Sequence, residues 1–337
     1  MPYLIRALGF AAFALSIAAN AESLPGSKIT RFDPALDALI ATDAHVEKLA
    51  EGFTWSEGPV WIASGGYLLF TDVPENKMYR WSAGSGVEVF LSPSGYDGPP
   101  LAGLREAGAN GLHVDGPNSV LVADSGSRVV SRLDLTSKRK QTIASHYSSQ
   151  RFNSPNDLAR TRDGTIFFTD PPYGLTNGND SALKELKFNG VYRIDKEGAV
   201  SVIDDSLTFP NGVALSPDQR TLYVANSDPN HPIWMRYSLD SQGKVKDKAV
   251  FADVRDLVGK APGLPDGIAV AETGHLFATG PGGVIIFTPE GKRLGRIETG
   301  SAIANCAFGD DGRTLYMTSH KQLARVRTLV AGSRLER

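Results

Sequence analysis

One arrangement of polar and apolar positions occurs six times along the chain. A polar residue is followed by a small or turn-compatible residue and then by the start of an apolar run. A second apolar run ends 14 or 15 positions after each polar residue, in the segments YLLFTD, SVLVAD, TIFFTD, TLYVAN, HLFATG and TLYMTS. The six polar residues are Glu57, Asn110, Asn156, Asn211, Asp266 and Asn305. A constant offset inside a looser period of 39 to 55 residues is typical of a radial repeat.

The repeat length predicts an all-β fold, a six-bladed β-propeller, because a blade of four short strands with variable loops needs about 40–50 residues. Each of the first five repeats contains a third and a fourth apolar segment, but the sixth ends near Arg327 without a fourth. The segment from Val46 to Gly52 precedes the first blade, so we expect it to pair with the last blade and cover its open edge. Residues 45–330 then form a single propeller domain, and residues 22–44 form a loose arm on its surface.

The first 21 residues differ in character from the repeats. Arg6 precedes an almost uninterrupted run of small and apolar residues from Ala7 to Ala19, and Ala19 and Ala21 occupy the two positions that determine cleavage. This pattern predicts a secretory signal peptide over residues 1–21, cleaved after Ala21, and hence a periplasmic or secreted protein. The apolar run is too short for a membrane anchor, which needs about 20 residues.

Composition agrees with a β-rich domain and narrows the possible partners. The 337 residues include 35 Gly and 20 Pro, and turn clusters separate the apolar runs. The formal net charge is −2, so no basic field is available to attract nucleic acid. The single cysteine, Cys306, allows no intramolecular disulfide.

The six polar residues are the candidate functional group. In a propeller the first strand of each blade lines the central axis, so these side chains should converge at one end of one channel. Glu57, Asn156, Asn211 and Asp266 would together offer two carboxylates and two amide oxygens. Such hard oxygen donors suit Ca²⁺, with Mg²⁺ or Mn²⁺ possible and Zn²⁺ less natural. Alternatively, each is an ordinary turn residue that caps a loop through its own backbone.

Other catalytic signatures are missing from the sequence. It contains no G-x-S-x-G elbow, no Walker A loop, no G-x-G-x-x-G fingerprint and no H-E-x-x-H motif, and its six histidines lack metal-ligand spacing. A non-enzymatic scaffold would tend to fill the axis with apolar side chains, so the polar starts favour a functional centre.

The motifs EGPVW, FNSPNDL, FFTDPPYGL, FPNGVALS and LPDGIAV resemble those of the gluconolactonase family, which includes regucalcin and is similar to the squid-type fluorophosphatases. The resemblance runs from about Val46 to Arg327. It implies a six-bladed propeller with a catalytic divalent metal at its axis, usually Ca²⁺, held by the residues that match the family's motifs. Those residues are Glu57, Asn156, Asn211 and Asp266. Two departures, Ser125 and the CAFGDDG segment around Cys306, fall outside this ligand set.

The resemblance also implies how the site would act. The metal would polarise a lactone carbonyl, and Asp266 would serve as the catalytic base or as a ligand on the side of the base. Asn110 and Asn305 would hydrogen-bond substrate hydroxyls or an intermediate oxygen. Tyr173, in DPPYGL, would wall one side of the pocket, or would be a packed loop aromatic.

The expected activity is metal-dependent hydrolysis of a small-molecule sugar lactone, gluconolactone or a related aldonolactone. The sequence leaves two alternatives open. One is a different hydrolase on the same site, either a phosphotriesterase or a lactonase for a non-sugar ring, since a fold does not determine its chemistry. The other is a non-enzymatic binding propeller.

Overall fold

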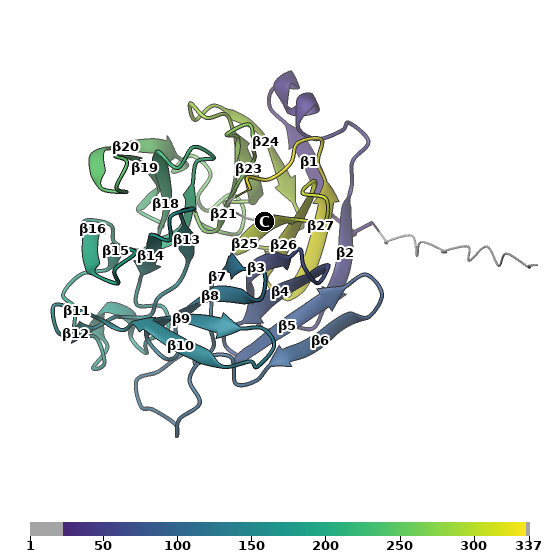
Figure 1. Cartoon of the computed structure of the whole chain (residues 1–337). Coiled ribbons are helices and arrows are strands. Elements are labelled where there is room, and N and C mark those ends of the chain that lie inside the picture. The colour runs from purple at the N-terminus through teal and green to yellow at the C-terminus, as the bar shows by residue number, and fades with distance from the viewer. Residues whose placement is uncertain (1–22, 335–337) are drawn as a thin grey trace, which may run out of the picture.

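The structure is a computed structural model, and it describes residues 23–334. Six antiparallel sheets are arranged around a central axis like the blades of a propeller (Figure 1). The fold class predicted from the repeat, an all-β six-bladed propeller, is confirmed. The predicted signal peptide, residues 1–21, lies outside the described residues. No helix among residues 23–334 is long and apolar enough to cross a membrane.

The first three blades follow the chain without interruption, each with its first strand innermost. Their strands are β3 (Ser56–Ile62), β4 (Tyr67–Asp72), β5 (Lys77–Ser82) and β6 (Gly86–Leu91); β7 (Leu112–Gly116), β8 (Ser119–Asp124), β9 (Val129–Asp134) and β10 (Lys140–Ala144); and β13 (Leu158–Arg160), β14 (Ile166–Asp170), β15 (Gly190–Ile194) and β16 (Val200–Asp204). A short hairpin of β11 (His146–Tyr147) and β12 (Gln150–Arg151) connects the second and third blades.

The fourth and fifth blades repeat the same order, and the sixth is completed from the other end of the chain. Their strands are β17 (Pro210–Leu215), β18 (Thr221–Asp228), β19 (His231–Leu239) and β20 (Val245–Asp253); β21 (Ile268–Val270), β22 (Leu276–Gly280), β23 (Gly283–Phe287) and β24 (Arg293–Glu298); and β25 (Asn305–Gly309), β26 (Thr314–Ser319), β27 (Gln322–Arg327) and β2 (Val46–Glu51).

The ring closes through β2, as the unpaired edge of the last blade predicts. β2 pairs antiparallel with β27, with Val46 opposite Val326 and Glu51 opposite Gln322. Arg325 reinforces this seam, because its Nε donates to Glu47 at 2.6 Å. The first and last blades also pack directly, with Trp61 stacked on Tyr316 at 5.6 Å between ring centroids.

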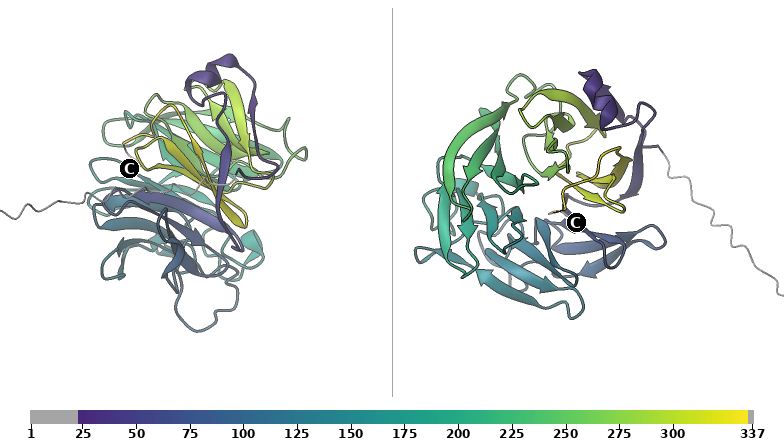
Figure 2. Two further views of the ribbon diagram at one scale, coloured as in Figure 1. Left: turned by 90° about the vertical axis from the view of Figure 1, so that its right-hand side faces the viewer. Right: turned by 45° about the horizontal axis from the view of Figure 1, so that its top comes forward.

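The segment before β2 is not the loose arm that we expected. Strand β1 (Lys28–Arg31) pairs with β24 and makes blade five a five-stranded sheet. The 3₁₀ helix η1 (Pro34–Ala38) follows and lies beside this blade (Figure 2). The physical reason is apolar burial, since Leu36, Leu39 and Ile40 are buried against Leu294 and Ile297 of β24 in one cluster.

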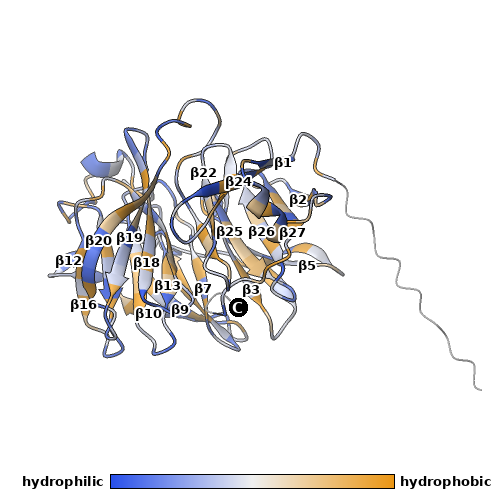
Figure 3. Ribbon diagram, turned by 90° about the horizontal axis from the view of Figure 1, so that it is seen from above, coloured by the Kyte–Doolittle hydropathy of each residue, from blue (hydrophilic) through white to orange (hydrophobic). Residues whose placement is uncertain are grey.

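The hydrophobic core is divided among the interfaces between neighbouring blades. Each cluster of buried side chains draws on two adjacent sheets, as where Phe167 of blade three packs with Val224 and Tyr237 of blade four. The outer strands are more polar, and Figure 3 shows this change of hydropathy from the inner strands toward the rim. Because the packing is between blades, the axis itself is left to the side chains of the six inner strands.

Candidate active site

The six inner strands contact one another in a closed ring, in the order β3, β7, β13, β17, β21 and β25. The polar residue of each repeat lies within two positions of the start of its inner strand. A cavity of about 570 Å³ opens at this end of the ring. Its lining includes six of the seven residues predicted for the site: Glu57, Asn110, Asn156, Tyr173, Asn211 and Asp266.

Glycine explains why a small residue follows most of the polar ones. At Gly58, whose φ is +50°, an added Cβ would lie 2.2 Å from the carbonyl oxygen of Asn110. At Gly212 it would lie 2.2 Å from the carbonyl oxygen of Asp266. Neighbouring inner strands therefore approach so closely that a side chain cannot stand between them. The polar–glycine pair brings one blade's backbone against the next blade's polar residue.

Threonine hydroxyls of the second strands hold the same junctions. Thr71 Oγ1 donates to the carbonyl of Asn110 at 3.1 Å, and Thr169 Oγ1 donates to the carbonyl of Asn211 at 2.6 Å. Both threonines are fully buried. In these two places a blade positions the polar residue of the blade that follows it.

Carboxylates dominate the electrostatics of the cavity. Burial away from water raises the pKa of Glu57 to about 8, and the nearby charge of Asp157 adds to the effect. Burial also raises the pKa of Asp266 well above its usual range, with further contributions from Glu57 and Asp157. Among residues 23–334, no Lys, Arg or His is a main cause of the pKa shift of either group. The anionic forms of these groups would be stabilised by a positive charge in the cavity.

Two amide oxygens in the cavity are buried and have no hydrogen-bond partner within residues 23–334: Asn110 Oδ1 and Asn211 Oδ1. A buried polar atom without a partner is costly, so each one requires an explanation. The structure describes no cluster of three or more His, Cys, Asp or Glu side chains arranged as a metal site within residues 23–334. A cation here would therefore depend on amide oxygens as well as on the two carboxylates.

Asn305 is the predicted site residue that does not line this cavity. Its Oδ1 accepts a hydrogen bond from the backbone N–H of Cys306 at 2.8 Å, which turns the amide away from the mouth of the ring. Its side chain instead hydrogen-bonds to Glu57 and Asp157. The contact between Asn305 and substrate stays a prediction; in the structure Asn305 connects two carboxylates one layer deeper than the larger cavity.

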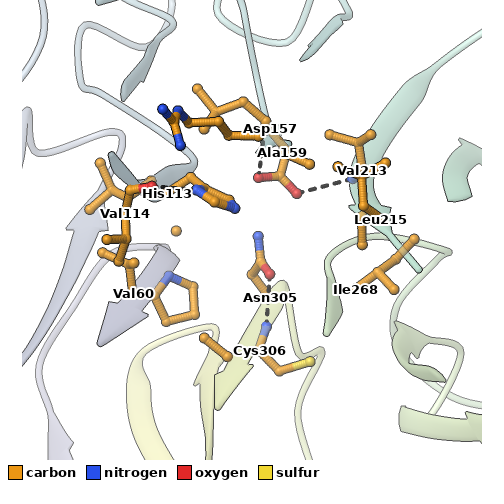
Figure 4. Close-up of a pocket in the computed structure, with 17 residues that line it drawn as sticks. Val60, His113, Val114, Asp157, Ala159, Val213, Leu215, Ile268, Asn305 and Cys306 are labelled. Carbon is orange, nitrogen blue, oxygen red and sulfur yellow. Dashed lines mark hydrogen bonds between the residues drawn. The ribbon is translucent and has the colours of Figure 1, made fainter. Parts of the chain in front are cut away.

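Figure 4 shows this deeper layer, a cavity of about 50 Å³ inside the ring. His113, Asp157 and Asn305 point into it among apolar side chains such as Val60 and Val213. The carbonyl of Val114 can only accept, so the hydrogen bond of 2.8 Å to His113 Nδ1 assigns the proton to that nitrogen. Burial lowers the pKa of His113, which keeps its ring neutral.

Sequence reasoning did not identify Asp157 as part of this centre. Asp157 follows Asn156 where three other repeats with an asparagine or aspartate have glycine, and this difference was the available signal. Its carboxylate accepts from the N–H of Leu158 at 2.9 Å and from that of Val213, on the next blade, at 3.2 Å. Its side chain thus makes the connection between blades that glycine makes elsewhere.

The rim of the cavity also includes residues that no repeat position indicates. Tyr173 stacks on Phe209 with 5.9 Å between ring centroids, and its hydroxyl lies within hydrogen-bonding reach of Ser227 and Asn211. Burial raises the pKa of Tyr173, so its hydroxyl stays neutral. Arg105 and Glu106 line the same cavity and pair with each other at 2.8 Å. Tyr173 is thus both packed against a neighbour and part of the wall.

Comparison with known proteins agrees with this architecture. Residues 55–321 match the family described as SMP-30/Gluconolactonase/LRE-like region. A gluconolactonase from Zymomonas mobilis is 44% identical over 90% of this chain and 87% of its own length. A solved gluconolactonase structure from Xanthomonas campestris superposes with a TM-score of 0.79 at 29% identity, covering 93% of this chain and 99% of that one.

A more distant solved structure shares the fold. It is regucalcin from Agrobacterium tumefaciens, described as a calcium-binding protein, with a TM-score of 0.68 at 20% identity over 86% of this chain and 96% of that one. One family assignment is supported by the match over residues 55–321, by the six-bladed ring and by the polar residues that converge in it. The chain belongs to the SMP-30/gluconolactonase/LRE-like family.

Proposed function

We propose that this chain hydrolyses a sugar lactone with the help of one divalent cation, Ca²⁺ in the first instance, held by Glu57, Asn156, Asn211 and Asp266. Membership of a family that includes a 44% identical gluconolactonase supports a lactone hydrolase. The observation that carries the cation is Asn211 Oδ1, a buried amide oxygen without a hydrogen-bond partner among the described residues, in a cavity shared with two carboxylates.

The residues present fit a hard cation. Oxygen donors from carboxylates and amides are the usual ligands of Ca²⁺. Asn211 Oδ1 has no other partner, and Glu57 and Asp266 repel each other in the buried cavity. A positive charge would resolve both features at once. Zn²⁺ fits less well, because none of these four residues is a histidine or a cysteine.

A bound cation would polarise the lactone carbonyl and stabilise negative charge that develops on its oxygen. The protein's own residues would do the rest. Asp266 would accept a proton from the attacking water, whose oxygen bonds to the carbonyl carbon. The ring C–O bond then breaks, and the proton is returned to the ring oxygen, which leaves an open hydroxy acid. Asn110 would hydrogen-bond a substrate hydroxyl through its amide, and Tyr173 would wall the pocket.

The deeper residues would support this chemistry without touching substrate. Asn305 hydrogen-bonds to Glu57 and so holds that carboxylate in place beneath the cavity. The carboxylate of Glu57 also accepts from the N–H of Gly58 at 3.0 Å. With two such contacts fixed, Glu57 is oriented before any ligand arrives, which lowers the cost of organising the site on binding.

The test is a substrate screen with controlled metal content. Protein stripped with a chelator and reloaded with Ca²⁺ should open gluconolactone or another aldonolactone, and stripped protein should not. Asp266→Asn keeps an oxygen donor but loses the basic carboxylate, so it should remain inactive even at metal concentrations that restore full occupancy. Glu197→Gln, on an exposed turn, is the matched control and should behave as the unaltered protein.

Four results would redirect the proposal. Equal rates for stripped and reloaded protein would refute metal dependence. Hydrolysis of paraoxon but of no lactone would favour a phosphotriesterase. Calcium binding without hydrolysis of any compound would favour a binding propeller. Recovery of most activity by Asp266→Asn at full occupancy would leave Asp266 as a ligand only.

We also propose export of the protein, on the basis of the predicted signal peptide over residues 1–21. The mass of the protein recovered from the periplasm or medium should correspond to a chain that begins at Glu22. A chain retained in the cytoplasm with Met1 intact would contradict export.

A further inference from the structure

One serine hydroxyl connects site residues from three blades. Ser227 lies in β18 and follows Asn226 near the end of that strand. Its Oγ donates to the carbonyl of Pro265, which directly precedes Asp266. The same Oγ accepts a hydrogen bond from Asn211 Nδ2 at 2.9 Å. The hydroxyl of Tyr173, from the third blade, is within hydrogen-bonding reach of it as well.

These contacts determine which way the amide of Asn211 faces. A serine hydroxyl has a single proton, and the carbonyl of Pro265 can only accept. The proton of Ser227 is therefore directed to Pro265, and Asn211 must present its NH₂ group to Ser227 rather than its oxygen. The oxygen, Asn211 Oδ1, then faces the cavity, where it is buried and has no hydrogen-bond partner in the described part of the chain.

An amide without such a restraint would have no reason to keep this orientation. Its nitrogen and oxygen are nearly equal in size, so rotation by 180° would place two N–H donors where a cation ligand is needed. Donors facing a cation would be repelled. The orientation of Asn211 therefore matters only if its oxygen has a positively charged or hydrogen-bond-donating partner in the cavity.

Part of this arrangement recurs in blade two. Ser125, directly after β8, donates to the carbonyl of Pro155 at 2.5 Å, and Pro155 precedes Asn156. A serine at or just past the end of the second strand thus anchors the residue before a predicted ligand in two places. Ser227 alone of these two also receives a described hydrogen bond from a predicted ligand. The double role distinguishes it from a simple loop anchor.

We propose that Ser227 is a positioning residue for the cation site: it selects the orientation of the Asn211 amide that presents Oδ1 as a ligand, and it anchors the backbone next to Asp266. This inference rests on the proposed function, because it assigns a role toward the same cation. Ser227 acts through Asn211 and Pro265 and makes no ligand contact of its own.

Calorimetric titration of Ca²⁺ into chelator-stripped full-length protein tests the inference without any activity measurement. Ser227→Ala should weaken binding about tenfold, as expected when one buried hydrogen bond that orients a ligand is lost. Ser227→Thr retains the hydroxyl and should bind within about threefold of the unaltered protein. Ser131→Ala removes another buried hydroxyl, one with no hydrogen-bond partner among the described residues, and should leave affinity unchanged.

A double-mutant cycle separates positioning from a general structural effect. If Ser227 acts through Asn211, then Ser227→Ala should weaken binding less in the Asn211→Ala background than in the unaltered protein. Circular dichroism melting of every variant checks that the loss is local, since the Tm of Ser227→Ala should stay close to that of Ser131→Ala.

The outcomes are distinguishable. No Ca²⁺ binding by the unaltered protein would overturn both the proposed cation site and this inference. Normal binding by the unaltered protein, with Ser227→Ala equal to Ser131→Ala, would overturn the inference alone. Full additivity in the cycle, or failure of Ser227→Thr to restore affinity, would also overturn it.

Discussion

The contact between Gly212 and Asp266 offers a direct test of how the ring builds its site. An ideal Cβ at Gly212 would lie 2.2 Å from the carbonyl oxygen and 2.7 Å from the carbonyl carbon of Asp266. Gly212→Ala therefore forces backbone against backbone, and the two strands must separate by roughly 1 Å before the new methyl group reaches ordinary contact. No flexible side chain is available there to give way.

The expected cost follows from that separation. Overpacking of a well-packed interior costs about 1–3 kcal/mol, and a clash with backbone between two blades should lie near the upper end. Displacement of Asp266 by about 1 Å is also enough to lower the rate of a positioned reaction by roughly 100-fold. We expect Gly212→Ala to lower Tm by about 5 °C or more. It should also lower kcat/KM for the lactone by far more than the loss of folded protein at the assay temperature would explain.

Gly84→Ala is the matched control. Gly84 is exposed, and an added Cβ there meets no atom within 4 Å. Thermal melting and lactone hydrolysis, measured side by side for both variants, provide the comparison. If Gly212→Ala matched Gly84→Ala in both Tm and kcat/KM, the close approach of the inner strands would not position Asp266, and the explanation of the polar–glycine repeat would be wrong.

Further predictions concern the arm, the surface and the cation. Leu36→Ala should lower the free energy of unfolding, measured in urea, by about 2–5 kcal/mol, because Leu36 is fully buried against blade five. Phe32→Ala, at a half-exposed side chain, should lower it far less. Equal losses would contradict the docked arm. The hydrogen bond and charge of Arg327 lower the pKa of Asp311 to about 2, so the pair contributes stability above the unfolded pKa near 4 that is lost as pH falls toward 2. Since Asp311 is more than half exposed, that contribution should be below about 1 kcal/mol. The difference in unfolding free energy between the unaltered protein and Asp311→Asn should shrink from pH 6 to pH 3. A difference that stays constant over this range would argue against the ion pair. Ca²⁺ at 100 times its Kd should raise the free energy of unfolding by about 2.7 kcal/mol, measured by urea titration, and Asp266→Ala should abolish the increase.

The sequence was sufficient to predict the ring because the repeat places an apolar strand after every polar start. It was also sufficient to predict the pairing of Val46–Glu51 with the last blade, since an open edge in a ring needs a partner. The segment from Pro34 to Ile40 contained its own signal: Leu36, Leu39 and Ile40 recur at one-turn spacing and are buried together. We had expected a loose arm there because no strand pattern surrounds those residues.

The repeat could not predict how deep along the propeller axis each polar side chain lies. Asn305 has the same offset of 14 positions as Asn156, yet its oxygen is used by the N–H of Cys306 and its amide faces inward. Asp157 and Ser227 act through contacts with neighbouring blades, at Val213 and Pro265 respectively. Such contacts join residues 38 to 56 positions apart, and no periodic pattern within a blade records them.

The pairing of β2 with β27 has a consequence for the order in which the molecule can form. Val46 lies opposite Val326, so a segment that is synthesised early cannot pair until a segment near the end of the chain has been synthesised. Contacts between such distant segments are slow to form because the chain must lose the entropy of a very large loop. Until the last strand emerges, β2 and the inner edge of β3 remain without their neighbours, and exposed strand edges at that stage can pair with other chains. The residues of the cavity come from blades all around the ring, so the cavity is complete only when the ring is closed. A nascent chain therefore completes its site in a single late step. Any cation that binds there will be found only on molecules in which β2 has already paired with β27.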